Sequence, residues 1–200
     1  MREIVMDKTL EKRIKQVIQE PIDIVPYNPQ WPTKFIHEKE HLLSLLPIDL
    51  IKRIEHFGST AIPGIPAKPI IDILVEVRSL TETKKQIVPI LTTRGYEYFW
   101  RPIIGESPPY YAWFIKRNQI GTRTHHIHMV ERDSELWDRL FFRDYLKEFP
   151  PVAKEYAILK KTLATKYPHD RIKYTKEKTT FIEKITEKSK RYYTTNKEKK

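Results

Sequence analysis

The sequence contains no cysteine, only five glycines among its 200 residues, and no long run of apolar side chains. Without cysteine the chain has no disulfides, no thiolate nucleophile and no cysteine-ligated metal site. Any metal must therefore be held by carboxylate, imidazole or hydroxyl groups. No stretch approaches the roughly 18 apolar residues of a membrane span, and the first residues lack the apolar centre of a signal peptide. We expect a cytoplasmic protein with no membrane partner.

Positive charge, in contrast, is plentiful and unevenly placed. The chain carries 37 basic and 26 acidic side chains, a net charge of +11, and residues 151–200 alone hold 15 basic and 6 acidic ones. Within 154–178 the bases are interleaved with tyrosines, which is typical of a surface that binds the phosphates of a nucleotide or RNA. The lysines at 197–200 are interpreted as part of a solvated tail.

The periodicity of the apolar residues predicts one α+β domain with a helical C-terminal part. Pro89 predicts a kink or an early stop in one of the helices, and the segment 101–109 is expected to be a loop between two aromatic strands. Helices are expected at 10–20, 33–46, 80–94, 134–149, 151–166 and 176–190, and strands at 22–25, 50–57, 69–77, 96–100, 110–117 and 124–130.

The strongest local feature is the segment HFGSTAIPGIPAKPIID at 56–72. Gly58 lets the backbone approach a ligand closely, and Ser59 and Thr60 offer hydroxyl and amide groups to phosphate oxygens. Asp72 lies inside an apolar run, where a carboxylate is costly unless it is paired, hydrogen-bonded or bound to a metal. Taken alone, the pattern also fits a tight turn in which Asp72 caps a neighbouring backbone group.

The order Gly58-Ser59 followed by Asp72 on the next strand resembles the signature of the polymerase-β-like nucleotidyltransferase superfamily. Four longer segments resemble the GrpB family more closely, and they occur in collinear order between about residues 22 and 185. They are YNPQWPTKF at 27–35, EHFGSTAIPGIPAKPIIDILVEV at 55–77, RTHHIHMVE at 123–131 and LFFRDYLKEFPPVAKEYAILKKTLA at 140–164. The expected organisation is a helical extension at 1–20, a GrpB-like domain at 21–190 and a flexible basic tail at 191–200.

This resemblance implies a nucleotidyltransferase-like mixed sheet flanked by helices, with a nucleotide held by the Gly-Ser loop. It also implies Mg²⁺ or Mn²⁺ bound by strand carboxylates, which promotes attack of an acceptor hydroxyl on the α-phosphate of an NTP. The superfamily usually has a second acid two residues after the first, but Leu74 occupies that position here. Glu76 is the next acid on the same face, ~13 Å from Asp72 along the strand, and is only a secondary candidate.

Two histidines are candidates to replace the second acid. His126 and His128 share one strand face by the period of two, and an H-x-H pair can direct two imidazoles at one ion or phosphate. We expect Asp72, His126 and His128 to be the catalytic residues, with Asp72 and His128 as metal ligands. The alternative is a pair of exposed or hydrogen-bonded strand histidines.

Basic residues complete the expected site. Lys68 and Arg123 are expected to bind phosphate together with Gly58, Ser59 and Thr60; a surface lysine before a strand is an equal alternative for Lys68. Arg143 is interpreted mainly as a structural residue beside Asp144. The remaining secondary candidates are Tyr156, Lys160 and Lys178.

The function expected from these features is transfer of a nucleotidyl group from an NTP to a hydroxyl of tRNA, another RNA or a small molecule. The alternative is a non-catalytic nucleotide- or RNA-binding module that has lost part of its metal site, an interpretation that Leu74 supports. A phosphohydrolase fits the residue types but not the Gly-Ser loop. The sequence does not indicate an oligomeric state.

Overall fold

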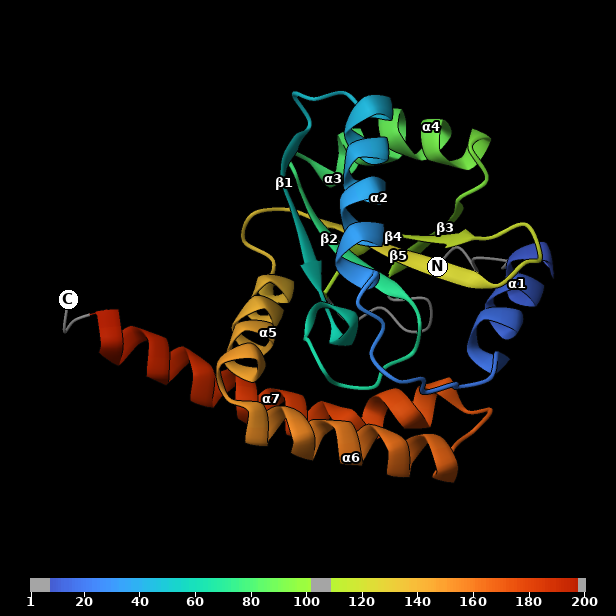
Figure 1. Cartoon of the computed structure of the whole chain (residues 1–200). Coiled ribbons are helices and arrows are strands. Elements are labelled where there is room, and N and C mark those ends of the chain that lie inside the picture. The colour runs from blue at the N-terminus through green and yellow to red at the C-terminus, as the bar shows by residue number, and fades with distance from the viewer. Residues whose placement is uncertain (1–7, 102–108, 198–200) are drawn as a thin grey trace, which may run out of the picture.

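The protein, described from a computed structural model over residues 8–101 and 109–197, is built on one five-stranded mixed sheet (Figure 1). The strand order is β1-β2-β5-β4-β3. Strands β2 and β5 run parallel, and the other neighbours are antiparallel. The strands are β1 (Ile51–Phe57), β2 (Ile71–Val77), β3 (Glu97–Arg101), β4 (Tyr111–Arg117) and β5 (Arg123–Val130). The predicted α+β class with a mixed sheet is confirmed.

The two faces of the sheet are covered differently. Alternate residues of β2, such as Ile71 and Ile73, belong to the main core with Trp31 and Leu42 of helix α2 (Trp31–Leu45). The same face is covered by the helical segment α3 (Leu80–Glu82), η2 (Thr83–Ile87) and α4 (Val88–Thr93). The opposite face carries Leu74 and aromatic residues of β3 and β4, against which α1 (Lys8–Gln19) packs. Because side chains alternate along a strand, Asp72 lies on this second face.

Three C-terminal helices hold the loop that follows β1. The loop residues Ile62 and Ile65 form one apolar cluster with Phe142, Leu146 and Tyr156. In Figure 1 these helices lie together beneath the sheet. They are α5 (Asp138–Glu148), which follows the 3-10 turn η3 (Glu135–Trp137), α6 (Pro150–Lys166) and α7 (Arg171–Lys197). The loop is therefore fixed between the sheet and the helices.

Three predicted elements differ from the structure. The expected strand at 22–25 is wrong: only Val25 pairs, through an isolated bridge to Ala67, and the Ile22 N–H donates to the carbonyl of Pro168. The flanking Pro21 and Pro26 have no N–H group to donate to a strand ladder. The helix expected at 80–94 is interrupted by the π-helical turn η2 immediately before Pro89, in line with the predicted kink.

The last helix is longer than the 176–190 predicted. It starts at Arg171, where Asp170 accepts a hydrogen bond from the backbone N–H of Lys173, and it continues to Lys197. Tyr192 and Tyr193 belong to the apolar cluster around α5 and donate hydrogen bonds to Glu148, so residues expected in a flexible tail are helical. Residues 102–108 of the expected loop and 198–200 of the tail lie outside the described residues. Within the described ranges, no helix has the length and apolar character needed to cross a membrane.

Candidate functional site

The pairing of β2 with β5 brings one carboxylate and two imidazoles together. In this parallel register Asp72 is opposite His126 and Leu74 is opposite His128. One ligand atom from each of Asp72, His126 and His128 can be chosen so that all three lie within 4.8 Å of one another. The expectation that His126 and His128 share a face is confirmed, and Asp72 lies on the same face.

The loop after β1 divides its polar residues between two sides. The backbone of Gly58 lies beside the Asp72 carboxylate, and Ser59 lies near the hydroxyl of Tyr156 of α6, whose pKa it lowers against the larger effect of burial. Thr60 lies away from the cluster: its buried hydroxyl donates to the carbonyl of Ile70 and therefore accepts from Nε2 of His56. Both hydrogen bonds of the Thr60 hydroxyl are made within the protein and link the loop to the residue before β2, so the hydroxyl does not fit the expected phosphate-binding role.

A chain of hydrogen bonds orients His126. Its Nδ1 lies 3.1 Å from Oδ1 of Asp72, and its Nε2 lies 3.4 Å from Nη1 of Arg123. A guanidinium only donates, so Nε2 accepts and Nδ1–H donates to the carboxylate. Burial lowers the pKa of His126 to about 4, although the hydrogen bond to Asp72 opposes this effect, and the ring is therefore neutral at pH 7.

Arg123 supports His126 and is not a free phosphate ligand. Its guanidinium forms an ion pair with Glu20 at 2.7 Å and donates to the backbone carbonyl of Val17 at 2.8 Å. The side chain is buried, so it is committed to the end of α1. Because Glu20 already neutralises the guanidinium, the structure does not fit the expectation that Arg123 binds phosphate directly.

His128 lies in an aromatic environment. The ring makes an edge contact with Phe57 at 5.2 Å between centroids and also packs near Tyr111 and Trp113. Burial lowers its pKa to about 3, which keeps it neutral. Its Nδ1 is buried and has no hydrogen-bond partner among the described residues. A buried polar atom without a partner is costly, and such atoms concentrate where a ligand binds.

Asp72 is ionised and remains reachable. Burial alone would raise its pKa, but the hydrogen bond from His126 and the charge of Lys68 outweigh burial and lower it. Its side chain is 29% exposed, so the carboxylate can contact a ligand.

Lys68 and Lys178 place positive charge beside this acid. Their ammonium groups lie 5.4 and 4.5 Å from the centre of the Tyr174 ring. Burial lowers the pKa of both, to about 8 for Lys178, and the charge of Lys178 lowers that of Lys68 further. Burial favours the neutral amine, and a bound anion would favour the charged ammonium form of both lysines.

Other predicted residues lie elsewhere. Lys160 is 2% exposed, and its Nζ donates to the carbonyl of Pro66, so it fixes the loop. Arg143 pairs with Glu55 and Asp144 and donates to the carbonyl of His56, in agreement with its structural interpretation. Glu76 lies four residues along β2 from Asp72 and is not in the cluster.

No second strand acid replaces the residue missing at position 74. Leu74 is fully buried in the apolar cluster of this face. Glu55 lies opposite it on β1, but its carboxylate is engaged by Arg53 and Arg143. Asp72 is thus the one carboxylate in the cluster of described residues.

Sequence reasoning missed Arg101 at the end of β3. Its guanidinium lies 5.9 Å from the ring centre of Tyr111 and 5.5 Å from that of Trp113, and its charge contributes to the low pKa of His128. Arg101 is two residues beyond Phe99, a core residue of the same face, so strand periodicity offered a signal. The order of the strands in the sheet, which places β3 near β5, could not be deduced from that periodicity.

The donor set of the cluster fits a divalent cation. It combines a reachable carboxylate oxygen with a neutral imidazole that has an unpartnered nitrogen. Imidazole with carboxylate suits Mn²⁺ and the later transition metals better than Mg²⁺, which prefers oxygen ligands alone. Both nitrogens of His126 are engaged, so Asp72 and His128 are the better ligand candidates.

Comparison with known proteins matches residues 21–188 to the family described as GrpB protein. The chain is 42% identical over 163 residues to the glutamate-rich protein GrpB of Alkalihalophilus pseudofirmus, covering 81% of this chain and 92% of that one. It is 39% identical over 172 residues to the UPF0157 protein YqkA of Bacillus subtilis, covering 86% of this chain and 48% of YqkA. The crystal structure of the conserved protein GrpB from Enterococcus faecalis superposes with a TM-score of 0.71 at 34% identity, covering 86% of this chain and 99% of that one.

Proposed function

The chain belongs to the GrpB family, and we propose that it binds a nucleoside triphosphate together with a divalent cation and transfers the nucleotidyl group to an acceptor hydroxyl, with pyrophosphate as the leaving group and the hydroxyl proton released to water. The observation that carries this proposal is the convergence of Asp72, His126 and His128 beside Gly58 and Ser59. The acceptor is a hydroxyl of RNA, tRNA included, or of a small molecule. The superfamily resemblance of the Gly-Ser loop and Asp72 supports the reaction type.

The proposed nucleotide lies with its phosphates between the Gly58–Ser59 backbone and the ammonium groups of Lys68 and Lys178. Phosphate oxygens would offset the positive charge that remains after Asp72 is counted. Ser59, which lies near the hydroxyl of Tyr156, supplies a hydroxyl and a backbone N–H at the same place.

Asp72 and His128 would hold Mn²⁺ or Mg²⁺, which neutralises phosphate charge and polarises the attacked phosphorus. His126 keeps the carboxylate of Asp72 oriented through its Nδ1–H, and Arg123 fixes the tautomer of that ring. His128 is neutral at pH 7, and its Nδ1 has no partner among the described residues, so the ring has a nitrogen available for the cation.

The test is incubation of the protein with each α-phosphate-labelled NTP, with Mn²⁺, with Mg²⁺ or with chelator, against total tRNA and a panel of hydroxylated metabolites. Cation-dependent transfer of label to one acceptor class is expected. An Asp72→Asn variant should lose the transfer. An Asp49→Asn variant should keep it, because Asp49 is exposed and lies before β1, at the end of that strand opposite Gly58. Absence of cation-dependent NTP binding would contradict the proposal.

One observation favours a second candidate, a non-catalytic nucleotide- or RNA-binding module. Leu74 is packed in the core, and Glu55 is paired with arginines. Asp72 is therefore the one carboxylate in the cluster of described residues, whereas a two-metal site uses several. Tight NTP binding without transfer to any acceptor would select this candidate over the enzyme.

A further inference from the structure

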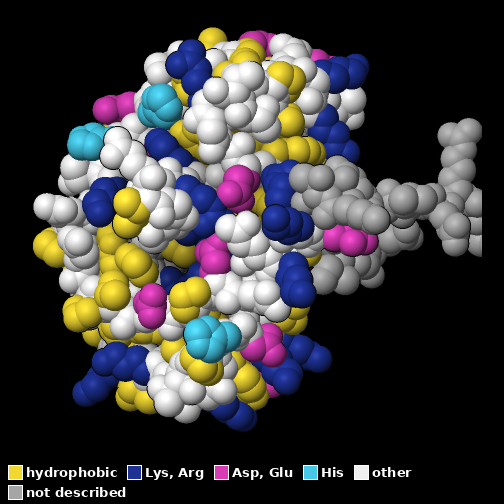
Figure 2. Space-filling view, turned by 90° about the vertical axis from the view of Figure 1, so that its right-hand side faces the viewer, with side chains coloured by type: hydrophobic (Ala, Val, Ile, Leu, Met, Phe, Trp, Pro, Cys, Tyr) yellow, Lys and Arg dark blue, Asp and Glu magenta, His cyan; other side chains and the backbone are white. Residues whose placement is uncertain are grey.

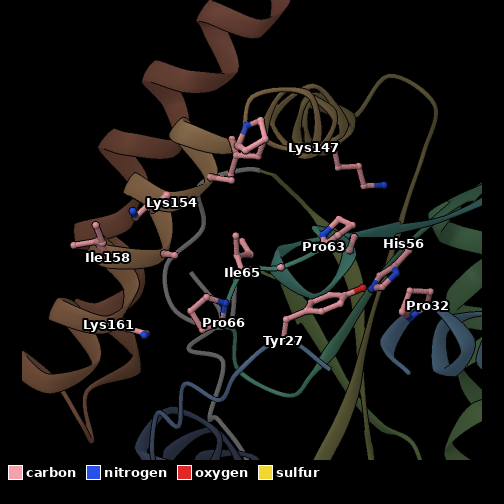
Figure 3. A pocket seen from close by; sticks show the side chains of 16 residues that line it. Tyr27, Pro32, His56, Pro63, Ile65, Pro66, Lys147, Lys154, Ile158 and Lys161 are labelled. Carbon is pink, nitrogen blue, oxygen red and sulfur yellow. The ribbon is translucent and has the colours of Figure 1, made fainter. Parts of the chain in front are cut away.

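A groove lies on the side of the 58–66 loop that faces α5 and α6. Its volume is about 860 Å³, within the range of small-molecule sites. Figure 3 shows α6 along one side, Pro63, Ile65 and Pro66 between the walls, and Tyr27 and His56 near Pro32 on the other side. None of the residues that form the Asp72 cluster lines this groove, so it is a separate feature.

The groove combines an aliphatic surface with a basic rim. Its lining includes Ala153, Ala157 and Ile158 of α6, and Ile158 is 58% exposed although it is apolar. Lys147, Lys154 and Lys161 line it as well, and the lining contains no acidic residue. Among the described residues, none of these three lysines forms an ion pair.

The lysines are placed to act together. Lys154 and Lys161 are seven residues apart on α6, which puts them on one helix face about 10.5 Å apart along the axis. Lys147 approaches from α5, and burial together with the charge of Arg143 lowers its pKa. Asp144 and Glu55 act on Lys147, but no carboxylate lines the groove beside Lys154 and Lys161, so an anionic ligand would offset the charge of these two.

The far end of the groove carries two uncharged polar groups. His56 donates through Nε2–H to Thr60, so its Nδ1 is an acceptor, and burial lowers its pKa to about 4. The hydroxyl of Tyr27 points toward His56 (Figure 3). These groups can form hydrogen bonds with a ligand but carry no net charge. The lysines at the rim therefore determine that the ligand is an anion.

We propose that this groove binds a small amphipathic anion, an aliphatic or alicyclic body carrying a phosphate, carboxylate or sulfonate. The aliphatic body lies over Ile65, Ala157 and Ile158, and the anionic group lies between Lys154 and Lys161. The volume fits a small ligand, and the lining offers prolines and aliphatic side chains rather than the stacked aromatic platforms on which single-stranded RNA binds. The proposal is independent of the nucleotide site.

The test uses dodecyl phosphate, kept below its micelle concentration, titrated calorimetrically into the full chain without metal. Saturable binding at one site is expected, at least tenfold tighter than that of inorganic phosphate, which has no apolar body, or of dodecyl maltoside, which has no charge. Equal affinity for inorganic phosphate, or no binding of dodecyl phosphate, overturns the proposal.

Charge-reversal variants locate the site. Lys154→Glu combined with Lys161→Glu should weaken binding at least tenfold. The matched control, Lys176→Glu with Lys184→Glu, makes the same charge change at exposed positions of α7 and should stay within twofold of the native chain. Equal weakening in both double variants would mean attraction by net charge alone and would overturn the proposal.

Three further measurements complete the test. Asp72→Asn should leave dodecyl phosphate binding unchanged, so that failure at this groove is distinguishable from failure of the nucleotide site. Cosedimentation with phosphatidylglycerol vesicles that depends on Lys154 and Lys161, with no binding of the free monomer, would make the surface a membrane contact and overturn a small-ligand groove. Ile158→Asp should weaken binding without altering the circular dichroism spectrum, because Ile158 is exposed.

Discussion

Gly58 lies so close to Asp72 that a Cβ atom at position 58 would stand 2.5 Å from Oδ2 of the carboxylate and 3.0 Å from its Cβ. Gly58 also has φ 77° and ψ −174°, a backbone conformation that is almost restricted to glycine. The loop and the carboxylate therefore require glycine for two separate reasons. Figure 2, which shows the right-hand side of Figure 1, has basic and acidic side chains interspersed across that face.

Gly58→Ala should displace Asp72 and impair cation-dependent nucleotide binding. The positive φ costs of the order of 1–3 kcal/mol in the free energy of unfolding, and the contact with the carboxylate adds to it. The control is Gly95→Ala, because Gly95 also has positive φ (84°) but no atom within 4 Å of its added Cβ. Thermal melts and nucleotide titrations of both variants should show lost stability in each and lost binding only at position 58. If the two variants bound nucleotide equally well, the contact between position 58 and the Asp72 carboxylate would not matter for nucleotide binding.

Glu20 should stabilise the fold in a pH-dependent way. Burial would raise its pKa, but hydrogen bonds from Arg123 and Arg117 outweigh burial and lower it below its ordinary 4.5. A lowered carboxylate pKa gives stability that is present above the pKa of the unfolded chain and is lost as pH falls through the folded value. Glu20→Gln should therefore cost about 2–4 kcal/mol at pH 7, because it leaves the buried Arg123 without its counter-charge.

Urea unfolding of both chains between pH 7 and pH 3 measures this effect, and the difference between them should shrink as the solution becomes more acidic. Asp49→Asn removes an exposed pair with Arg78 and should change stability by less than about 1 kcal/mol. A difference between Glu20→Gln and the native chain that is the same at pH 7 and pH 3 would mean that the carboxylate charge is not the cause.

The buried Lys160 should make the free energy of unfolding increase as the pH is raised above neutral. Burial and then the charge of Lys178 lower its pKa to about 7, compared with an ordinary value of 10.5. Between these two values the unfolded chain binds more protons at this site, so the free energy of unfolding increases with pH, by up to about 1.4 kcal/mol per unit. Lys160→Met should remove this slope from pH 7 to 10. Parallel stability curves for the two chains would show that the ammonium stays charged throughout.

Strand periodicity predicts that the two histidines share a face, but the pairing of β2 with β5 is what brings Asp72 to them. The alternation in β5 put His126 and His128 together, and the apolar run of β2 marked Asp72 as an acid that needs partners. These signals are local, since the side-chain direction in a strand depends only on sequence position.

The roles of the basic residues could not be predicted in the same way. Arg123 is neutralised by Glu20, which is about a hundred residues earlier in the chain, and Lys160 is bound by the carbonyl of Pro66. Thr60 is held by His56 and by the carbonyl of Ile70. In each case a tertiary contact decides whether a polar group is free for a ligand, and no local pattern carries that information.

In the proposed function, the charge of Asp72 holds a divalent cation for nucleotide binding. The most direct measurement is the affinity for NTP, with and without Mn²⁺, of the native chain and of Asp72→Asn, with the melting temperature recorded on the same samples. Asparagine keeps the size and the oxygen that accepts from Nδ1 of His126, so the fold should persist. The variant should melt cooperatively, and its Mn²⁺-dependent affinity for NTP should fall at least tenfold. A variant that binds NTP with Mn²⁺ as tightly as the native chain would contradict this role of Asp72.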